Sequence, residues 1–310
     1  MTEVSRLRGA AGRSNFLSDE KSPGIRSTRL LRSLSRRSTF ATRTTLTYLD
    51  DPMMDFELYR LHVEDGIAVV TFDRPPVNAQ NRQSREELVA LFDALSDWED
   101  VRVVILTGAG KTFSAGADVK ERVNLHAKPG DYLRHNRLTR EYFYAVSDCE
   151  KPVIAAVNGP AIGAGFALML ACDIMLASDD AFFVMPEIDV GLAGGARFLM
   201  EHFGRSKSRT MYFTGRRQSP QELYRLGVIE AVVPRDRLMD EAMSIAREIA
   251  AKSPIAVRRI KKAFNVVSEM PVRDGYRFEQ TVTVDLSQTE DAQEAQRAFV
   301  EKRKPVFTGR

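Results

Sequence analysis

The chain has 310 residues, of which 44% are hydrophobic and 28% are charged, and its formal net charge is +3. This composition is typical of a globular protein with one sizeable core, and it favours one domain plus extensions. The positive excess lies mostly in the first fifty residues, so the remainder gives little electrostatic support for a nucleic-acid partner. Cys149 and Cys172 lack the spacing of a zinc site or a disulfide framework, and we expect no metal.

Residues 1–52 differ from the rest of the chain, because they are rich in arginine, serine and threonine and have weak apolar periodicity. Two interpretations stay open. The composition is that of a mitochondrial transit peptide, which would place the mature protein in the mitochondrial matrix. Alternatively, the segment is a disordered extension, or lies upstream of a true start at Met53 or Met54, in a cytoplasmic bacterial protein.

The globular pattern begins near Phe56. Apolar residues on both sides of Asp65-Gly66 predict two strands joined by a hairpin turn. Ser84 is followed three residues later by Glu87, a capping-box pattern that predicts a helix start. Further along, short apolar runs predict buried strands and 3.6-residue periodicity predicts helices. The strands are expected over 101–106, 153–157, 174–177 and 228–233, and the helices over 132–146 and from 163 to 170.

The core therefore alternates strand and helix, which indicates an α/β fold with largely parallel pairing. The last third is mostly helical, with helices expected at about 236–251, 254–268 and 290–303. We divide the chain into the extension 1–52, a core over 53–250 and a helical C-terminal region over 251–310. That region could pack on a neighbouring subunit or fold back on its own core.

One segment imitates a membrane span, because Val153 to Cys172 carries no charge. A helix of about 20 residues would be needed to cross a bilayer. The turn residues Asn158-Gly159-Pro160 near its start favour a strand, a loop and a buried helix instead. We therefore expect no membrane association.

Two glycine-rich stretches, 106–118 and 157–167, each follow a buried strand. A strand, small residues and a helix start present free backbone N–H groups, and two such loops could converge on one oxygen as an oxyanion hole. Nucleotide-binding motifs do not fit. The phosphate-loop spacing would need glycine where Ile105 stands, and both GxGxxG frames fail at their last position, Phe113 and Leu168. Glycines that only permit tight turns are the structural alternative.

Five segments together resemble the crotonase (enoyl-CoA hydratase/isomerase) superfamily over about residues 56–310. The first signature is similar to Phe113-Ser114-Ala115-Gly116-Ala117-Asp118-Val119-Lys120, and the second to Lys151-Pro152-Val153-Ile154-Ala155-Ala156-Val157-Asn158-Gly159-Pro160-Ala161-Ile162-Gly163-Ala164-Gly165. The others are Asp73-Arg74-Pro75-Pro76-Val77-Asn78-Ala79, Pro186-Glu187-Ile188 with Gly191-Leu192, and Ala298-Phe299-Val300-Glu301-Lys302-Arg303-Lys304-Pro305.

The resemblance implies a fold of repeated ββα units and a helical trimerisation region, in homotrimers or dimers of trimers. It implies an enzyme acting on an acyl-CoA through an enolate, with CoA as part of the substrate and no other cofactor. The N–H groups of Ala117 and Ala164 would be the oxyanion donors, although family members usually have glycine at the second position. CoA would run past Arg74 and Val77, with its adenine near Ala115 and Lys120. Lys302 would reach the phosphates of a neighbour's CoA, and solvated surface charges are the alternative for Arg74 and Lys302.

The sequence departs from the family's two-carboxylate hydratases at one position. Where they carry a glutamate near the start of the second-signature helix, this chain has Ala167, while the second glutamate is present as Glu187. The aspartate that dienoyl isomerases add is replaced by Gly195. We expect a one-glutamate site with Glu187 as acid/base, although a salt-bridged structural acid is the other interpretation.

The reaction stays open at this point. Hydration, double-bond isomerisation, and hydration of an aryl-propenoyl-CoA followed by retro-aldol cleavage all suit a one-glutamate site. A catalytically weak acyl-CoA-binding protein is the rival from another class, and Ala167 favours it, whereas Glu187 and the two glycine-rich segments favour an enzyme.

Overall fold

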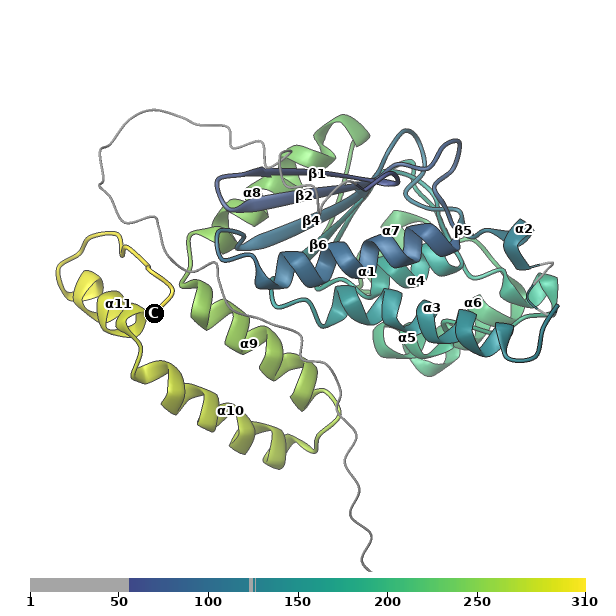
Figure 1. Cartoon of the computed structure of the whole chain (residues 1–310). Coiled ribbons are helices and arrows are strands. Elements are labelled where there is room, and N and C mark those ends of the chain that lie inside the picture. The colour runs from purple at the N-terminus through teal and green to yellow at the C-terminus, as the bar shows by residue number, and fades with distance from the viewer. Residues whose placement is uncertain (1–55, 123–124, 126) are drawn as a thin grey trace, which may run out of the picture. The chain divides into compact units, whose positions relative to one another are not determined.

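A computed structural model describes residues 56–122, 125 and 127–310 (Figure 1). The predictions for residues 1–52, of a targeting or disordered extension, lie outside the described residues. They stay predictions, as do the boundaries proposed for the core and the helical region.

Within the described residues the main sheet has six strands, in the order β1-β2-β4-β6-β8-β10 (Figure 1). β1 and β2 are antiparallel and turn at Asp65 and Gly66, which have φ angles of 52° and 77°. Each of the other pairs in this sheet is parallel, so the predicted α/β fold with largely parallel pairing is confirmed. The strands are β1 (Tyr59–Glu64), β2 (Ile67–Phe72), β4 (Val103–Gly108), β6 (Val153–Val157), β8 (Ile174–Ser178) and β10 (Ala231–Val233).

Two smaller sheets pair short strands taken from the loops. β3 pairs with β5 and β7 pairs with β9, both in parallel. The four strands are β3 (Ala79–Gln80), β5 (Gly116–Ala117), β7 (Ala161–Ile162) and β9 (Phe183–Val184).

The helices of the core connect the strands of the main sheet. They are α1 (Arg82–Asp97), α2 (Val119–Arg122), α3 (Asp131–Ser147), α4 (Ala164–Leu170), η1 (Glu187–Val190), α5 (Ala196–His202), α6 (Arg205–Thr214), α7 (Pro220–Arg225), η2 (Arg235–Arg237) and α8 (Leu238–Ala250). The C-terminal helices are α9 (Pro254–Val267), α10 (Val272–Ser287) and α11 (Glu290–Val300).

The predicted capping box at Ser84 is wrong. The N-cap of α1 is Asn81, whose side-chain oxygen accepts the N–H of Ser84 at 2.8 Å. Ser84 itself lies inside the first turn, and its hydroxyl donates to the Asn81 carbonyl. Asparagine caps helices as well as serine does, and here the earlier of the two candidates begins the helix.

The two faces of the sheet carry separate cores. Because side chains alternate along a strand, Val104 and Leu106 of β4 pack with α1, α3 and α4, whereas Val103 and Ile105 pack with α8. α8 and α1 cover opposite faces of the sheet (Figure 1). α9 is joined to the core by Lys261, which is 5% exposed and whose Nζ lies 2.7 Å from Asp173 Oδ2. The carboxyl ends of β2, β4 and β6 lead into the loops that hold the small sheets and the site.

Candidate active site

The two glycine-rich segments are joined to each other by backbone hydrogen bonds. A bridge pairs Ser114, just before β5, with Ala161 in β7. The N–H of Ile162 donates to the Ser114 carbonyl at 3.0 Å. β7 then pairs with β9, which leads directly into Pro186 and Glu187. The first segment, the second segment and the strand before Glu187 therefore lie side by side.

The predicted donors Ala117 and Ala164 lie close together in this arrangement. A Cβ built on Gly116 would stand 3.2 Å from the backbone nitrogen of Ala164. Ala164 is the first residue of α4, where an N–H group has no helical carbonyl to bind. The N–H of Asp118 donates to the Gln80 carbonyl across the β3–β5 pair. Because successive residues in a strand direct their N–H groups to opposite sides, the N–H of Ala117 faces away from β3.

The close approach of the segments requires glycine at position 116. Gly116 has a φ of +81°, and a Cβ built there would stand 2.4 Å from the carbonyl oxygen of Ile162. No side chain fits at that distance, and the left-handed backbone favours glycine as well. The glycine predicted from the first signature therefore has a packing reason that the sequence alone does not reveal.

Glu187 begins the 3₁₀ helix η1, and its carboxylate lies against Gly163. A Cβ built on Gly163 would stand 2.6 Å from Glu187 Oε1 and 3.7 Å from Oε2. Gly163 has a φ of +53°, and its N–H donates to the Val184 carbonyl at 2.8 Å. The carboxylate is thereby held beside the start of α4, one residue from Ala164 in the chain.

Ala167 and Gly195, which stand where family members of two subtypes carry acidic residues, are neighbours in the fold. A Cβ built on Gly195 would stand 3.7 Å from the Cβ of Ala167 and 2.5 Å from the terminal methyl carbon of Met185. Ala167 and Met185 are each 1% exposed. The space that longer acidic side chains would need is therefore lined by apolar atoms, and Met185 packs into it. The next carboxylate along the chain, Asp173, is bound to Lys261.

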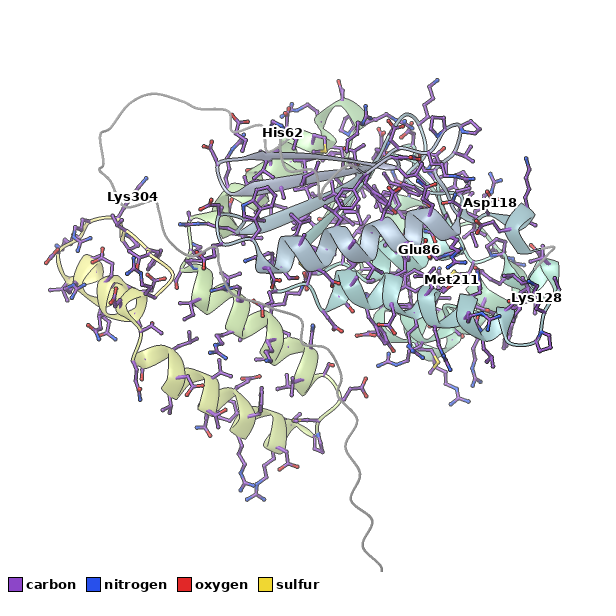
Figure 2. All side chains as sticks on the ribbon, in the orientation of Figure 1. His62, Glu86, Asp118, Lys128, Met211 and Lys304 are labelled. Atoms are coloured by element: carbon purple, nitrogen blue, oxygen red, sulfur yellow. The ribbon has the colours of Figure 1, made fainter. Side chains whose placement is uncertain are left out.

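Arg74 connects the turn before β3 to the end of β5. Its guanidinium donates to the Ala79 carbonyl at 2.9 Å and to Asp118 Oδ2 at 2.8 Å. Burial favours the neutral acid at Asp118, but hydrogen bonds from Arg74 and from the N–H of Lys120 outweigh it, so the pKa of Asp118 is lowered. Asp118, labelled in Figure 2, follows Ala117 directly. Arg74 therefore has a structural role in the free protein.

The other residues predicted to contact CoA lie in two regions. The carbonyl of Val77, which is 39% exposed, accepts the N–H of Ala115 at 2.9 Å, so these two lie together beside β5. Lys120 is exposed in α2. Lys302 is exposed after α11, with a φ of 54°. The first three lie in or next to the paired loops, and Lys302 lies in the C-terminal region.

Residues 62–310 match the sequence family described as enoyl-CoA hydratase/isomerase. The chain belongs to this family. It is 40% identical over 242 residues to the "(7aS)-7a-methyl-1,5-dioxo-2,3,5,6,7,7a-hexahydro-1H-indene-carboxyl-CoA hydrolase" of Rhodococcus jostii, covering 78% of this chain and 93% of the relative. It is 37% identical over 254 residues to the carnitinyl-CoA dehydratase of Citrobacter koseri, covering 79% and 95%.

Solved structures agree with the family assignment. An enoyl-CoA hydratase from Bacillus anthracis superposes with a TM-score of 0.77 at 33% identity, covering 82% of this chain and 100% of the other. The fold is thus the crotonase fold, and the protein is an enzyme of that family. The activities that describe this family are those of enoyl-CoA hydratases and isomerases.

Three buried polar residues of this crotonase-fold site were not predicted. Asn78 has a φ of 53°, and its amide donates to the carbonyls of Ala109 and Thr112 in the first glycine-rich segment. The hydroxyl of Ser114 donates to the Asn78 carbonyl at 2.7 Å. Gln80 is fully buried between the segments. No local signal marked them, because each stands among other polar or small residues, and only their partners in the fold show that they are buried.

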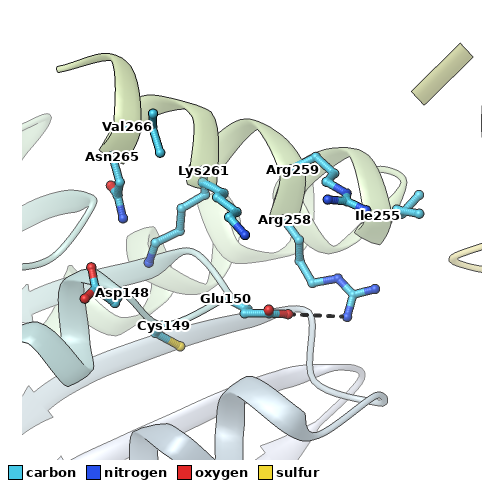
Figure 3. Close-up of a pocket in the computed structure, with 10 residues that line it drawn as sticks. Asp148, Cys149, Glu150, Ile255, Arg258, Arg259, Lys261, Asn265 and Val266 are labelled. Carbon is cyan, nitrogen blue, oxygen red and sulfur yellow. Dashed lines mark ion pairs between the residues drawn. The ribbon is translucent and has the colours of Figure 1, made fainter. Parts of the chain in front are cut away.

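A cavity lies away from the loops that hold the small sheets. It measures about 520 Å³ and lies between α9 and residues 148–150, where Arg258 pairs with Glu150 at 3.8 Å (Figure 3). Its lining residues include none of the predicted site residues. Among the described residues, no group of three or more His, Cys, Asp or Glu side chains could hold a metal ion. In the same part of the chain, no helix has the length and apolar character that crossing a membrane requires.

Proposed function

We propose that this enzyme moves protons on an acyl-CoA through an oxyanion-stabilised enolate, with Glu187 as its single acid/base. One observation carries the proposal. The backbone of Gly116, the nitrogen of Ala164 and the carboxylate of Glu187 are in close proximity around Gly163. Backbone donors and one carboxylate are together sufficient for enolate chemistry at a thioester.

The donors would bind the thioester oxygen. The α-proton of a thioester is weakly acidic because the carbanion must spread onto the carbonyl oxygen. N–H groups of Ala117 and Ala164 aimed at that oxygen would stabilise the enolate more than the substrate, which lowers the barrier. Ala164 keeps the N–H group that a glycine would offer, and its Cβ narrows the site on that side.

Glu187 would carry the protons in hydration. Its carboxylate takes a proton from water while the water oxygen bonds to the β-carbon, and the double-bond electrons move onto the thioester oxygen. The protonated acid then returns a proton to the α-carbon as the carbonyl reforms. Ala167 removes the second carboxylate that would share this task, so one group performs both transfers.

The same groups allow isomerisation. Glu187 would remove a proton from the α-carbon of a 3-enoyl-CoA and return it at the γ-carbon of the dienolate. An aryl-propenoyl-CoA would be hydrated first. Loss of the β-hydroxyl proton would then break the bond between the α- and β-carbons, leaving an aldehyde and an enolate that is protonated to acetyl-CoA.

These reactions need no metal or redox cofactor, because each one adds water, moves protons or breaks a carbon–carbon bond without net oxidation or reduction. CoA enters as part of the substrate. Val77, Ala115 and Lys120 adjoin β5, which supports a CoA path along this edge of the site. Arg74 forms an ion pair with Asp118, and we propose that this pair holds the end of β5 in place.

The test compares wild type with Glu187→Gln, which keeps shape and removes the base. Crotonyl-CoA and a 3-enoyl-CoA are supplied separately, and exposed Glu99→Gln is the matched control. We expect the Glu187 variant to lose about 100-fold or more of the rate on the better substrate, the usual contribution of acid–base catalysis, and the control to lose none. The better substrate separates hydratase from isomerase. An active wild type matched by Glu187→Gln would refute the one-glutamate mechanism.

A hydrolase is the second candidate, because a relative 40% identical to this chain is named a CoA hydrolase. In that case water would add to the thioester carbonyl carbon, and the same two donors would bind the tetrahedral oxyanion. Collapse of that intermediate would break the C–S bond, and the departing CoA sulfur would take up the proton lost by the water. Free CoA release, followed with a thiol reagent, distinguishes thioester hydrolysis from hydration. Release of CoA without any hydroxyacyl-CoA would favour the hydrolase.

We also propose that the protein forms homotrimers or dimers of trimers. Large apolar side chains are exposed on the C-terminal helices, among them Phe264 at 63%, Val272 at 90% and Phe299 at 86%. Apolar exposure of this extent supports a subunit contact. The mass of the intact protein in solution, from light scattering, tests the proposal, and a monomer would refute it.

A further inference from the structure

The side chain of Gln80 lies between the two segments that carry the proposed donors. It is fully buried. Its amide nitrogen donates to the carbonyl of Ala164 at 3.1 Å and to the hydroxyl of Ser114 at 3.3 Å. Gln80 and Ala164 are 84 residues apart in the chain, so this contact depends on the tertiary fold. Through its side chain, Gln80 holds the residue that offers the second donor.

The backbone of Gln80 holds the first donor segment. Gln80 is the register partner of Ala117 in the β3–β5 pair, and its carbonyl accepts the N–H of Asp118 at 2.9 Å. The same carbonyl accepts a hydrogen bond of 2.9 Å from the guanidinium of Arg85, which is 1% exposed. One residue therefore contacts both donor segments, and a buried arginine fixes its backbone.

The amide of Gln80 is only partly satisfied. Its Oε1 is buried and accepts no hydrogen bond from any residue that the structure describes. An unsatisfied buried acceptor is destabilising, so it offsets part of the stability gained from the two hydrogen bonds that the amide donates. The amide cannot be turned to relieve this, because the Ala164 carbonyl requires a donor at that position. A costly group retained between two functional segments indicates a role in the site.

We propose that Gln80 is a positioning residue that sets the spacing and direction of the Ala117 and Ala164 N–H groups. The inference rests on the proposed function, because it assumes that these groups bind the thioester oxygen. Gln80 does not touch the substrate. Its effect is to hold two backbone donors from different segments against one oxygen, which preorganises the charge stabilisation.

The experiment uses Gln80→Leu in the full-length enzyme, with Gln80→Met as a second, unbranched variant. Gln83→Leu is the control, because Gln83 lies three residues away on α1 and bonds to Glu57 and Glu87, outside the donor segments. The first readout is the absorption of bound dimethylaminocinnamoyl-CoA. Hydrogen bonds to its thioester carbonyl shift the absorption of this conjugated probe to longer wavelength.

We expect wild type and Gln83→Leu to give the full red shift, and the Gln80 variants to bind the probe with a similar Kd but a reduced shift. On the better enoyl-CoA substrate, kcat should fall about 10- to 100-fold with little change in KM, as expected for donors displaced by a fraction of an ångström. The Tm of Gln80→Leu should change little, because removing the unsatisfied acceptor offsets the loss of the two hydrogen bonds that the amide donates.

The outcomes separate the two proposals. Gln80 variants with an undiminished red shift and an unchanged kcat overturn the positioning role and leave the proposed donors intact. A wild type that binds the probe without any shift overturns the donors, and the role of Gln80 with them. If the Gln80 variants have a lower kcat and a lower Tm but keep the full red shift, the loss of rate is a stability effect. That result also overturns the positioning role.

Discussion

The carboxylate of Glu187 lies where the side chain of any residue but glycine at position 163 would have to be. A Cβ built on Gly163 stands 2.6 Å from Glu187 Oε1, far inside van der Waals contact. The glycine of the second signature therefore makes room for the proposed acid/base. Gly163 immediately precedes Ala164 in the chain, so the carboxylate lies beside the residue that offers the second proposed donor.

Gly163→Ala should lower turnover more than it lowers stability. The new methyl group displaces the Glu187 carboxylate, and an alanine is strained at a φ of +53°. We expect kcat to fall about 100-fold, the loss typical of a catalytic group displaced by an ångström. The control is Gly204→Ala, where a Cβ meets no atom within 4 Å. Steady-state kinetics with unchanged far-UV circular dichroism checks this, and an equal kcat in both variants would contradict it.

Asp118→Asn tests how Arg74 acts. The ion pair at 2.8 Å holds the end of β5, so its loss should lower kcat/KM about tenfold, in line with a partly buried charged hydrogen bond. If Arg74 acts through Asp118, Arg74→Met should lower kcat/KM by the same factor, and the double variant should lower kcat/KM no further. If Arg74 binds CoA directly, Arg74→Met should raise KM further and the two effects should add.

Lys261→Met should destabilise the fold. Its Nζ lies 2.7 Å from Asp173 and 2.9 Å from the Lys151 carbonyl, and its side chain is 6% exposed. Burial raises the pKa of Asp173 and Lys261 opposes that rise. Because the Asp173 side chain is 29% exposed, the loss should be about 2 kcal/mol, less than for a fully buried pair.

Urea unfolding measures the effect of Lys261→Met, with exposed Lys262→Met as the neighbouring control. The double variant with Asp173→Asn should regain part of the stability, because it no longer leaves a carboxylate without its cation. Equal unfolding midpoints for Lys261→Met and Lys262→Met would show that the ion pair does not join α9 to the core.

Glu222→Gln should remove a pH-dependent part of the stability. Hydrogen bonds from Arg225 and then Lys207 lower the pKa of Glu222 to about 2 from its ordinary 4.5. Because the folded pKa is the lower one, this stabilisation is fully present above the ordinary value and is lost as the pH falls toward 2. Wild type should exceed Glu222→Gln in Tm at pH 7, and the gap should close with acidification. A gap independent of pH would contradict this assignment.

Local signals predicted much of the fold. The turn at Asp65-Gly66 is confirmed, because it depends on the chemistry of adjacent residues. The helix α10 (Val272–Ser287) was not predicted. It contains β-branched residues and Gly275, whose helix propensity is weak, and its helical state is supported by contact with α9.

The sequence by itself determined which segments could carry chemistry. Each of these segments consists of a strand, small residues and a helix start, and Pro186-Glu187 follows them in the chain. The residue types predict these local backbone conformations. Only the tertiary structure decided how these segments meet. The contacts of Gly116 with Ile162, of Gly163 with Glu187 and of Gln80 with Ala164 join residues far apart in the chain. Such contacts arise from strand pairing between loops, and the direction of an N–H group depends on its strand partner, which no local pattern specifies.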